Sequence, residues 1–401
     1  MHNRMTRILS AISLLVVIPT VAFASTSRVA GLGVPGDYIK DYTGMFTYVS
    51  GVNSVGNLIY AEPNTSPGVG GQAMGAVLGN LWEGRMGTWG LHLRNFSPAL
   101  GQSMFGNAVT TTGVPGFTDP NTNGEALDLM WGHKMGSGNL GLRYSRSFIS
   151  NETPAGTTEG DGTFGRNVWG LGAGFGFALN PNTDVEIAGD FQNRSFKGTA
   201  DGVVSTAADD GGGTYLVAGR AFVKGGANVM WVPVARLYQF DLSSVSPAAV
   251  ATSAKISGWE VGGAGNWSIG SDDLFVLGLQ VVGNNAESTV GTGPKQEANE
   301  TFYPNAFMAI ETHVNSWLTL RFGARNAVLY SLKLEQGAPT TTTTTIKQHV
   351  FDFNMGAGVK LGSLMLDATL ADNFWNNPVG AVWNNGVGPQ PFPRVSATYS
   401  F

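Results

Sequence analysis

The chain has 401 residues, of which 57 are Gly and only 13% are charged, although about a quarter of an average sequence is charged. Its hydrophobic content of 42% excludes a disordered chain, while its mean hydropathy of +0.02 excludes a bundle of apolar membrane helices. With 23 Lys and Arg against 28 Asp and Glu, there is no basic excess for nucleic-acid binding. The absence of Cys excludes disulfides, thiolate metal sites, Fe–S clusters and thiol nucleophiles.

The first 24 residues have the features of a secretory signal peptide. Arg4 and Arg7 precede an apolar stretch, 8–21, and Ala22-Phe23-Ala24 then provides the small residues of a cleavage site before Ser25. A membrane anchor would need a longer apolar run. Cleavage removes two Arg and no acid, so the formal charge becomes −5 − 2 = −7. We therefore expect an exported, mildly acidic mature chain.

Beyond Ser54 the dominant pattern is an alternation of apolar with small or polar residues, which is the period of a β-strand. In 169–179, large apolar residues alternate with Gly and Ala, and the segments 275–282, 318–323 and 351–361 follow the same rule. The small, polar face could not form the second half of a packed core, which disfavours a soluble sandwich. Strands that face lipid on one side remain as the explanation.

The spacing of the breaks predicts the topology. Seven short gaps fall at 83–87, 135–139, 180–183, 224–228, 270–273, 315–316 and 362–363. Eight long polar gaps alternate with them, at 63–70, 97–124, 151–165, 199–213, 242–254, 285–299, 336–345 and 376–391. This alternation is typical of a transmembrane antiparallel up-and-down β-barrel with short periplasmic turns and long extracellular loops. It predicts sixteen strands in residues 54–401; the first, 55–62, is interrupted by Gly56-Asn57, and its loss with one neighbour would give fourteen.

The last residues, 394–401, place Tyr399 and Phe401 on one face and Ser396, Thr398 and Ser400 on the other. This ending resembles the terminal strand of bacterial outer-membrane β-barrels, including porin-like channels, in which a final aromatic residue is read by the barrel-assembly machinery. The resemblance implies an all-β protein in the outer membrane of a Gram-negative bacterium. Its expected partners are outer-membrane lipid, the assembly machinery and small solutes, and a homo-oligomer is left open.

Residues 25–53 are too irregular for a wall strand and too few for the separate plug domain of a TonB-coupled receptor. Their small residues, acids and aromatic residues resemble the mature N-terminus of the long-chain fatty-acid transport family, in which such a segment folds inside the barrel. The resemblance implies a lumenal segment, with Tyr38, Asp41, Tyr42, Phe46 and Tyr48 as its candidate functional residues. The alternative is a simple periplasmic lead-in.

Charged residues of the strands are expected to line a pore, because a charge on the lipid face near the bilayer centre costs about 2–4 kcal/mol. The inward set comprises seven bases, seven acids and one His: His92, Arg94, Asp128, Arg143, Glu186, Asp190, Arg194, Arg220, Glu260, Glu311, Arg321, Arg325, Asp352, Lys360 and Asp367. Arg321 and Arg325 share a face and could guide anionic solutes past Asp352. Alternatively, they pair with wall carboxylates and brace the barrel.

The sequence favours a channel for passive diffusion of small hydrophilic solutes. A transporter for hydrophobic compounds and a structural or adhesive barrel are the alternatives. An enzyme is not expected, because no catalytic motif is present and His133 and His349 fall on the lipid face, which leaves only His92 and His313. No cofactor and no metal site are expected.

Overall fold

The computed structural model describes residues 25–63, 73–79, 81–82, 84–94, 126–153, 162–200, 203–207, 214–241, 244–245, 251–270, 272–336, 342–371 and 394–401. At several strand ends, only the backbone of these residues is described. The predicted signal peptide, residues 1–24, lies outside the described residues.

Five short helices precede a series of strands. They are α2 (Thr26–Leu32), η1 (Gly36–Tyr38), η2 (Tyr42–Phe46), η3 (Val49–Gly51) and α3 (Val52–Val55). The strands are β1 (Leu58–Glu62), β2 (Ala73–Leu78), β3 (Thr88–Arg94), β4 (Ala126–Met135), β5 (Gly138–Thr153), β6 (Gly162–Asn180), β7 (Thr183–Ala200), β8 (Val203–Ala207), β9 (Thr214–Lys224), β10 (Val229–Asp241), β11 (Ser244–Val245), β12 (Ala251–Ile269), β13 (Asp273–Val290), β14 (Gln296–His313), β15 (Leu318–Gln336), β16 (Thr342–Leu361), β17 (Leu364–Ala371) and β18 (Arg394–Ser400). No helix in the described part of the chain is long and apolar enough to cross a membrane.

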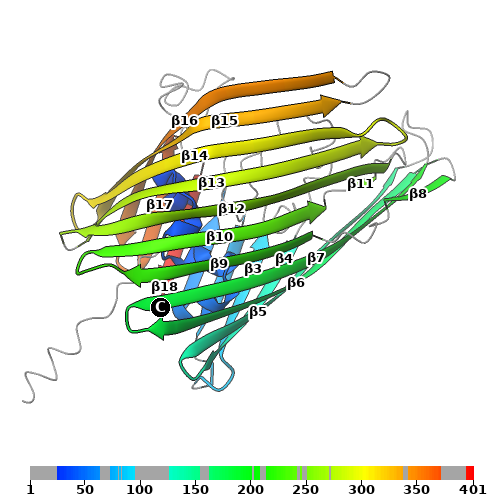
Figure 1. Cartoon of the computed structure of the whole chain (residues 1–401). Coiled ribbons are helices and arrows are strands. Elements are labelled where there is room, and N and C mark those ends of the chain that lie inside the picture. Colours follow the sequence, from blue (N-terminus) through cyan, green and yellow to red (C-terminus); the bar gives the residue numbers. More distant parts are fainter. Residues whose placement is uncertain are drawn as a thin grey trace, which may run out of the picture.

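The described strands form one antiparallel sheet that closes on itself (Figure 1). Of its eighteen strands, β8 and β11 are short pieces that pair with the ends of β7 and β12, which leaves sixteen strands in the ring. The ring closes between β1 and β18, where Leu58 is opposite Ser400 and Ala61 opposite Ala397. The predicted barrel of sixteen strands is therefore confirmed. Its first strand begins at Leu58 instead of Val55, because α3 occupies the residues before it.

The two faces of the wall differ as the alternation predicts. On β6, Leu171 is 53% exposed, whereas Gly170 and Gly172 on either side of it are buried. On β15, the inward-facing Arg321 is buried within the ring. A closed ring with no free strand edge and an apolar outer surface is the form in which a sheet crosses a membrane. The chain is thus an outer-membrane β-barrel.

The predicted short turns all join neighbouring wall strands. The predicted long loops between β12 and β16, however, are shorter than expected, because the strands extend into them. The gap predicted at 285–299 is mostly strand, since β13 runs to Val290 and β14 begins at Gln296. Strands β12 to β16 contain 18 to 20 residues. At ~3.3 Å per residue they are about 60 Å long, which exceeds the ~30 Å hydrocarbon core even when they are tilted. Polar residues there continue the pairing outside the bilayer, while Ala286 and Ser288 on one face of β13 stay buried.

The orientation of the wall predicts how a charge on its outer face will act. Leu279 is 55% exposed on the outer face of β13, and its replacement by Arg should lower the unfolding free energy in lipid vesicles by about 2–4 kcal/mol. Ile269, 53% exposed at the short turn, is the matched control, and Ile269→Arg should cost about 0–1 kcal/mol. Denaturant unfolding measures both, and equal costs would contradict the assigned depth.

Candidate functional site

Residues 25–57, which we call the plug segment, lie inside the barrel. Helix α2 contacts β14 to β18, whereas η3 and α3 contact strands between β3 and β7 on the opposite side of the ring. In Figure 1 the blue plug segment is enclosed behind the green and yellow strands. A segment that touches opposite walls must fill the space between them. The lumen is therefore occupied along its short-turn end.

The plug segment forms its short helices through caps supplied by its own residues. The Ser25 hydroxyl accepts a hydrogen bond from the Arg28 N–H at 3.1 Å, and Gly33 ends α2 in the left-handed conformation with φ of 60°. The Asp41 carboxylate accepts hydrogen bonds from the Gly44 N–H at 3.3 Å and the Thr43 hydroxyl at 2.5 Å. Such local caps satisfy backbone N–H groups at the ends of the helices that have no partner within the helix.

The inward glycines of the wall are where the plug backbone rests. A Cβ atom on Gly323 would lie 1.6 Å from the Leu32 carbonyl oxygen, and one on Gly141 would lie 2.3 Å from the carbonyl carbon of Val49. At α2, the Cβ position of Gly31 is 2.9 Å from the Cα of Gly356. No other residue could occupy these positions without moving the plug segment. The bare face that the sequence suggested as an open pore lining is here a seat for the plug segment.

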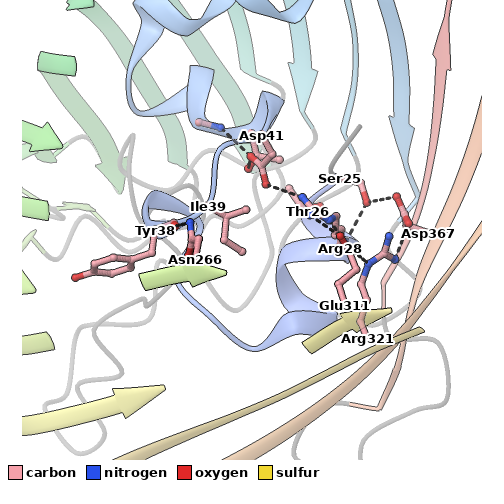
Figure 2. A network of polar contacts seen from close by, with 12 residues as sticks. Ser25, Thr26, Arg28, Tyr38, Ile39, Asp41, Asn266, Glu311, Arg321 and Asp367 are labelled. Carbon is pink, nitrogen blue, oxygen red and sulfur yellow. Dashed lines mark hydrogen bonds and ion pairs between the residues drawn. The ribbon is translucent and has the colours of Figure 1, made fainter. Parts of the chain in front are cut away.

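One end of the plug segment is held by a buried chain of ion pairs, shown in Figure 2. The Arg28 guanidinium donates from Nε and Nη2 to the two oxygens of Glu311 at 2.6 and 2.7 Å. Glu311 also accepts from Arg321 Nε at 2.6 Å, and Arg321 Nη1 donates to Asp367 at 2.7 Å. The Ser25 hydroxyl donates to the other oxygen of Asp367 at 2.9 Å. Wall and plug segment thus share one network.

A second network holds the middle of the plug segment. Arg236 on β10 lies between Asp37 of the plug segment, with Nη1 and Oδ2 2.9 Å apart, and Glu260 on β12, with which it also forms an ion pair. The Tyr38 hydroxyl donates to Glu260 at 3.3 Å. The Asn266 amide donates to the Tyr38 carbonyl at 2.8 Å (Figure 2). All five side chains are buried. The Arg236 guanidinium thus lies between two carboxylates, one from the plug segment and one from the wall.

Two further arginines of the wall hold carbonyl groups of the plug segment. Arg220 donates from Nε to Glu186 at 2.6 Å and from Nη1 to the Asp37 carbonyl at 3.1 Å, with its guanidinium 4.2 Å from the Tyr48 ring centre. Arg143 donates to Asp190 and to the Phe46 carbonyl, each at 2.5 Å. Each arginine therefore joins a wall carboxylate to the plug backbone.

Beside Phe46 is a buried polar group on β1, β3 and β4. The Tyr60 hydroxyl and His92 Nδ1 are 2.6 Å apart, and the Phe46 ring packs 4.6 Å from the His92 ring. Asp128 accepts hydrogen bonds from Arg94 at 2.9 Å and from Ser145 at 2.5 Å. In the described part of the chain, no three His, Cys, Asp or Glu side chains lie together in a way that could hold a metal ion.

Burial shifts the pKa values of several side chains of the plug segment. The pKa of Asp41 is raised because burial disfavours its charged form more than Arg28, 3.8 Å away, and the hydrogen bonds from Thr43 and Gly44 favour it. Burial likewise raises the pKa values of Tyr38, Tyr42 and Tyr48 above the ordinary tyrosine range. Their hydroxyls therefore stay neutral inside the lumen.

The structure places the sequence-predicted residues as follows. Arg94, Arg143, Arg220, Glu260, Glu311, Arg321 and Asp367 are buried inward residues that pair with other wall residues or the plug segment, and Glu186 and Asp190 pair with Arg220 and Arg143. Arg325 and Asp352 form a half-buried pair at 2.7 Å. Lys360 is exposed near a short turn, and the side chain of Arg194 is outside the described residues. Tyr399 and Phe401 face outward, 47% and 57% exposed. A path for solutes along these residues stays a prediction.

Sequence reasoning missed six buried charged residues of the described chain: Arg28, Asp37, Glu62, Arg236, Asp241 and Glu300. Arg236 follows inward Val232 and Val234, so both faces of β10 are apolar at this point and the alternation alone is ambiguous. The signal that could have identified it is the charge, which cannot face lipid. The apolar residues before it are inward because they pack against Tyr38 and Ile39 of the plug segment.

A cavity of about 1210 Å³, which we call the vestibule, lies at the short-turn end of the barrel. It is bounded by Arg28, Lys40 and Val55 of the plug segment and by residues of the short turns, among them Lys360 and His313. Arg321 and Glu311 of the first ion-pair network also border it. The ion pairs that hold the plug segment are thus reached from this end.

The close packing at Gly323 predicts that a side chain there displaces the plug segment. Gly323→Val should destabilise the folded barrel by about 1–3 kcal/mol, because overpacking costs that much where neither neighbour can yield. Gly263→Val is the matched control, since a Cβ on Gly263 meets no atom within 4 Å. Thermal unfolding in detergent measures both. Equal stabilities would show that the plug segment is not seated on this glycine.

The ion pairs of Arg28 are expected to stabilise the docked position of the plug segment. Arg28→Ala removes two charge-assisted hydrogen bonds to Glu311 and the ion pair with Asp41, so it should raise the undocked fraction. The natural chain has no Cys, so Ser50→Cys, at a position only 2% exposed, reports undocking through its rate of maleimide labelling. Lys40→Ala, which breaks the exposed pair with Asp184, should leave that rate unchanged. Equal rates in all variants would contradict the role of Arg28.

No protein-family model and no curated protein sequence matches this chain. Among solved structures it is similar to CdiB from Escherichia coli, with 9% identity, a TM-score of 0.43, and coverage of 86% of this chain and 62% of that one. It is also similar to BauA, the ferric preacinetobactin receptor from Acinetobacter baumannii, with 11% identity, a TM-score of 0.42, and coverage of 78% and 53%. The chain spans less than two thirds of the length of either protein.

Proposed function

We propose that this protein is a gated outer-membrane channel for the passive diffusion of small hydrophilic solutes, with the plug segment as its closed gate. The observation that carries the proposal is that four buried wall residues that hold the plug segment also have an ion-pair partner on the wall. Glu311 pairs with Arg321, and Arg236 pairs with Glu260. Arg220 likewise pairs with Glu186, and Arg143 pairs with Asp190. Glu62 on β1 is an exception, because its hydrogen bonds come from the Thr26 N–H and the Tyr42 hydroxyl of the plug segment.

Because of this pairing, undocking of the plug segment costs little electrostatic free energy on the wall. An unpaired charge in a buried site costs several kcal/mol, so a permanent plug would use wall charges that depend on it alone. Here the wall charges remain paired when Arg28 and Asp37 leave. Arg28 also has a partner within the plug segment, because Asp41 is 3.8 Å away. Displacement of the plug segment therefore leaves Glu311 and Arg236 paired on the wall.

The chemistry of the lumen favours hydrophilic solutes. Once the plug segment is displaced, the short-turn half of the lumen presents arginines, carboxylates and glycines of the wall. The vestibule adds polar and charged residues at the exit. Rings of charged side chains attract hydrated ions and polar molecules and repel apolar ones. Transport of hydrophobic compounds and a structural role remain the competing hypotheses.

A reversible lock on the plug segment tests the proposal. The hydroxyls of Ser27 and Ser396 are 2.6 Å apart, so Ser27→Cys together with Ser396→Cys places two thiols in contact in a chain that has no other Cys. In planar bilayers the reduced double variant should show ion-conducting openings, and oxidation should abolish them. Arg28→Ala should increase the open probability severalfold, because it weakens docking.

The single variants Ser27→Cys and Ser396→Cys control for the substitutions themselves and should be insensitive to oxidation. Conductance that persists in the oxidised double variant would overturn the gate, because the plug segment would then not need to move. If neither the wild type, the reduced double variant nor Arg28→Ala conducts ions, the channel itself is contradicted. Uptake of a hydrophobic probe in vesicles without ion conductance would favour the hydrophobic transporter.

A further inference from the structure

The outer face of the barrel carries an apolar groove that crosses strands β4 to β9. We call it the outer groove; its volume is about 680 Å³, within the ~300–1,000 Å³ of typical small-molecule sites. Seven large side chains form its sides, each between 41% and 57% exposed: Leu129, Leu142, Tyr144, Leu171, Phe191, Tyr215 and Val217. The lumen and the plug segment lie on the other side of the wall.

The groove is hollow because its floor consists of small residues. Ala173 and Gly189 are register partners on β6 and β7, and both face outward between larger neighbours. Beneath them, Gly172 faces inward, and a Cβ there would lie 2.1 Å from an oxygen of Asp190. The inward-facing pair of Arg143 and Asp190 therefore borders the groove from below. The wall is thin at this position.

We propose that the outer groove binds one acyl chain of a membrane lipid. The groove is continuous with the lipid-facing wall and lies seven to ten residues from the short turns on β6 and β7, which places it within the hydrocarbon core. Acyl chains are the solvent at this depth. A groove there excludes water and must be filled, since empty apolar space forfeits dispersion contacts along its whole lining.

Two other occupants fit the groove less well. A lipid headgroup needs a charged or hydrogen-bonding partner, but Arg143 and Asp190 are turned inward and satisfy each other at 2.5 Å. The Tyr215 hydroxyl already donates to Gln239 at 3.4 Å. A second copy of the barrel presents a broad convex wall, which cannot enter a groove bounded by single side chains. A thin, flexible chain can.

The bound chain would lie across the wall from a plug anchor. Arg143, under the floor, donates to the Phe46 carbonyl of the plug segment. By packing on Ala173 and Gly189, the acyl chain supports the thin wall at the point where Arg143 and Asp190 meet. The site therefore joins membrane lipid to the wall on which the plug segment rests.

Photocrosslinking with a phospholipid tests the site. The full-length protein is reconstituted in phosphatidylethanolamine vesicles that contain a trace of the same lipid with a diazirine near the middle of one acyl chain. After irradiation, labelled residues are mapped by mass spectrometry. The label should be enriched severalfold on 142–144, 171–173 and 189–191 over 277–279, a comparably exposed part of the outer wall on β13.

Filling the groove provides the matched control. Ala173→Trp places an indole on the floor of the groove and should abolish the enrichment. Ala235→Trp, at an equally outward and exposed position on β10 outside the groove, should preserve it. Gly189→Leu is the second variant, because a Cβ there makes only ordinary contact, at 3.8 Å. Folding of each variant is checked by its heat-dependent gel mobility.

Even labelling of the whole outer wall would overturn the proposal, as would an enrichment that survives both Ala173→Trp and Gly189→Leu. Crosslinks between two barrels through this face would assign the groove to a second copy instead and would also overturn it. Label confined to probes that carry the diazirine in the headgroup would exclude an acyl chain.

Discussion

The cost of placing a charged side chain against hydrocarbon is the constraint on which this structure depends. Because the wall strands cannot turn their charges outward, the arginines and carboxylates of the strands gather inside the ring, where they must find partners or water. The wall supplies partners across neighbouring strands, as in Arg321 with Glu311 and Asp367. The plug segment adds Arg28 and Asp37 to the same networks. The polarity of the lumen thus follows from the apolarity of the exterior.

Apolar packing sets the default position of the plug segment. Tyr42, Phe46 and Val49 pack with Tyr60 and other wall residues in one cluster, and Leu32 and Tyr38 pack with Phe307 in another. Full burial of a large apolar side chain is worth about 1.5–3 kcal/mol. Several such side chains together outweigh the ion pairs, whose net value is small because desolvation offsets their attraction. Apolar contacts therefore hold the plug segment in place, and the charges fix its register.

Much of the fold was predictable because one physical rule, alternation between lipid and lumen, acts on nearly every strand residue. The short turns and the count of sixteen follow from it. The rule fails where its premise fails. At Val232 and Val234 the lumen is as apolar as the lipid, because the plug segment packs there, so the face of Arg236 was ambiguous. Residues 283–290 of β13 are almost all small or polar on both faces, so the sequence carries no alternation of hydrophobicity there, although the burial of the strand still alternates.

The site itself was less accessible from sequence. Aromatic residues such as Tyr38 and Tyr48 suggested a lumenal segment only through a resemblance, and nothing in their local sequence specifies which wall residues they meet. Contacts such as Ser27 with Ser396 or Arg28 with Glu311 join residues hundreds of positions apart. The sequence of the wall strands indicates the plug segment only through the inward-facing glycines on which it rests. The alternating pattern identifies these glycines, but it does not distinguish a seat for a plug segment from the lining of an open pore.

The contact between Ser27 and Ser396 has a consequence for assembly. The plug segment is the first described part of the chain to be exported, yet it rests on β17 and β18, which are the last parts to arrive. Its final position therefore does not exist until almost the whole ring has been inserted. Contacts of such long sequence separation form late, since the loop between them must first be closed. Closure of β1 onto β18 and docking of the plug segment are then the same late event, and until it occurs the barrel is a sheet with an open edge.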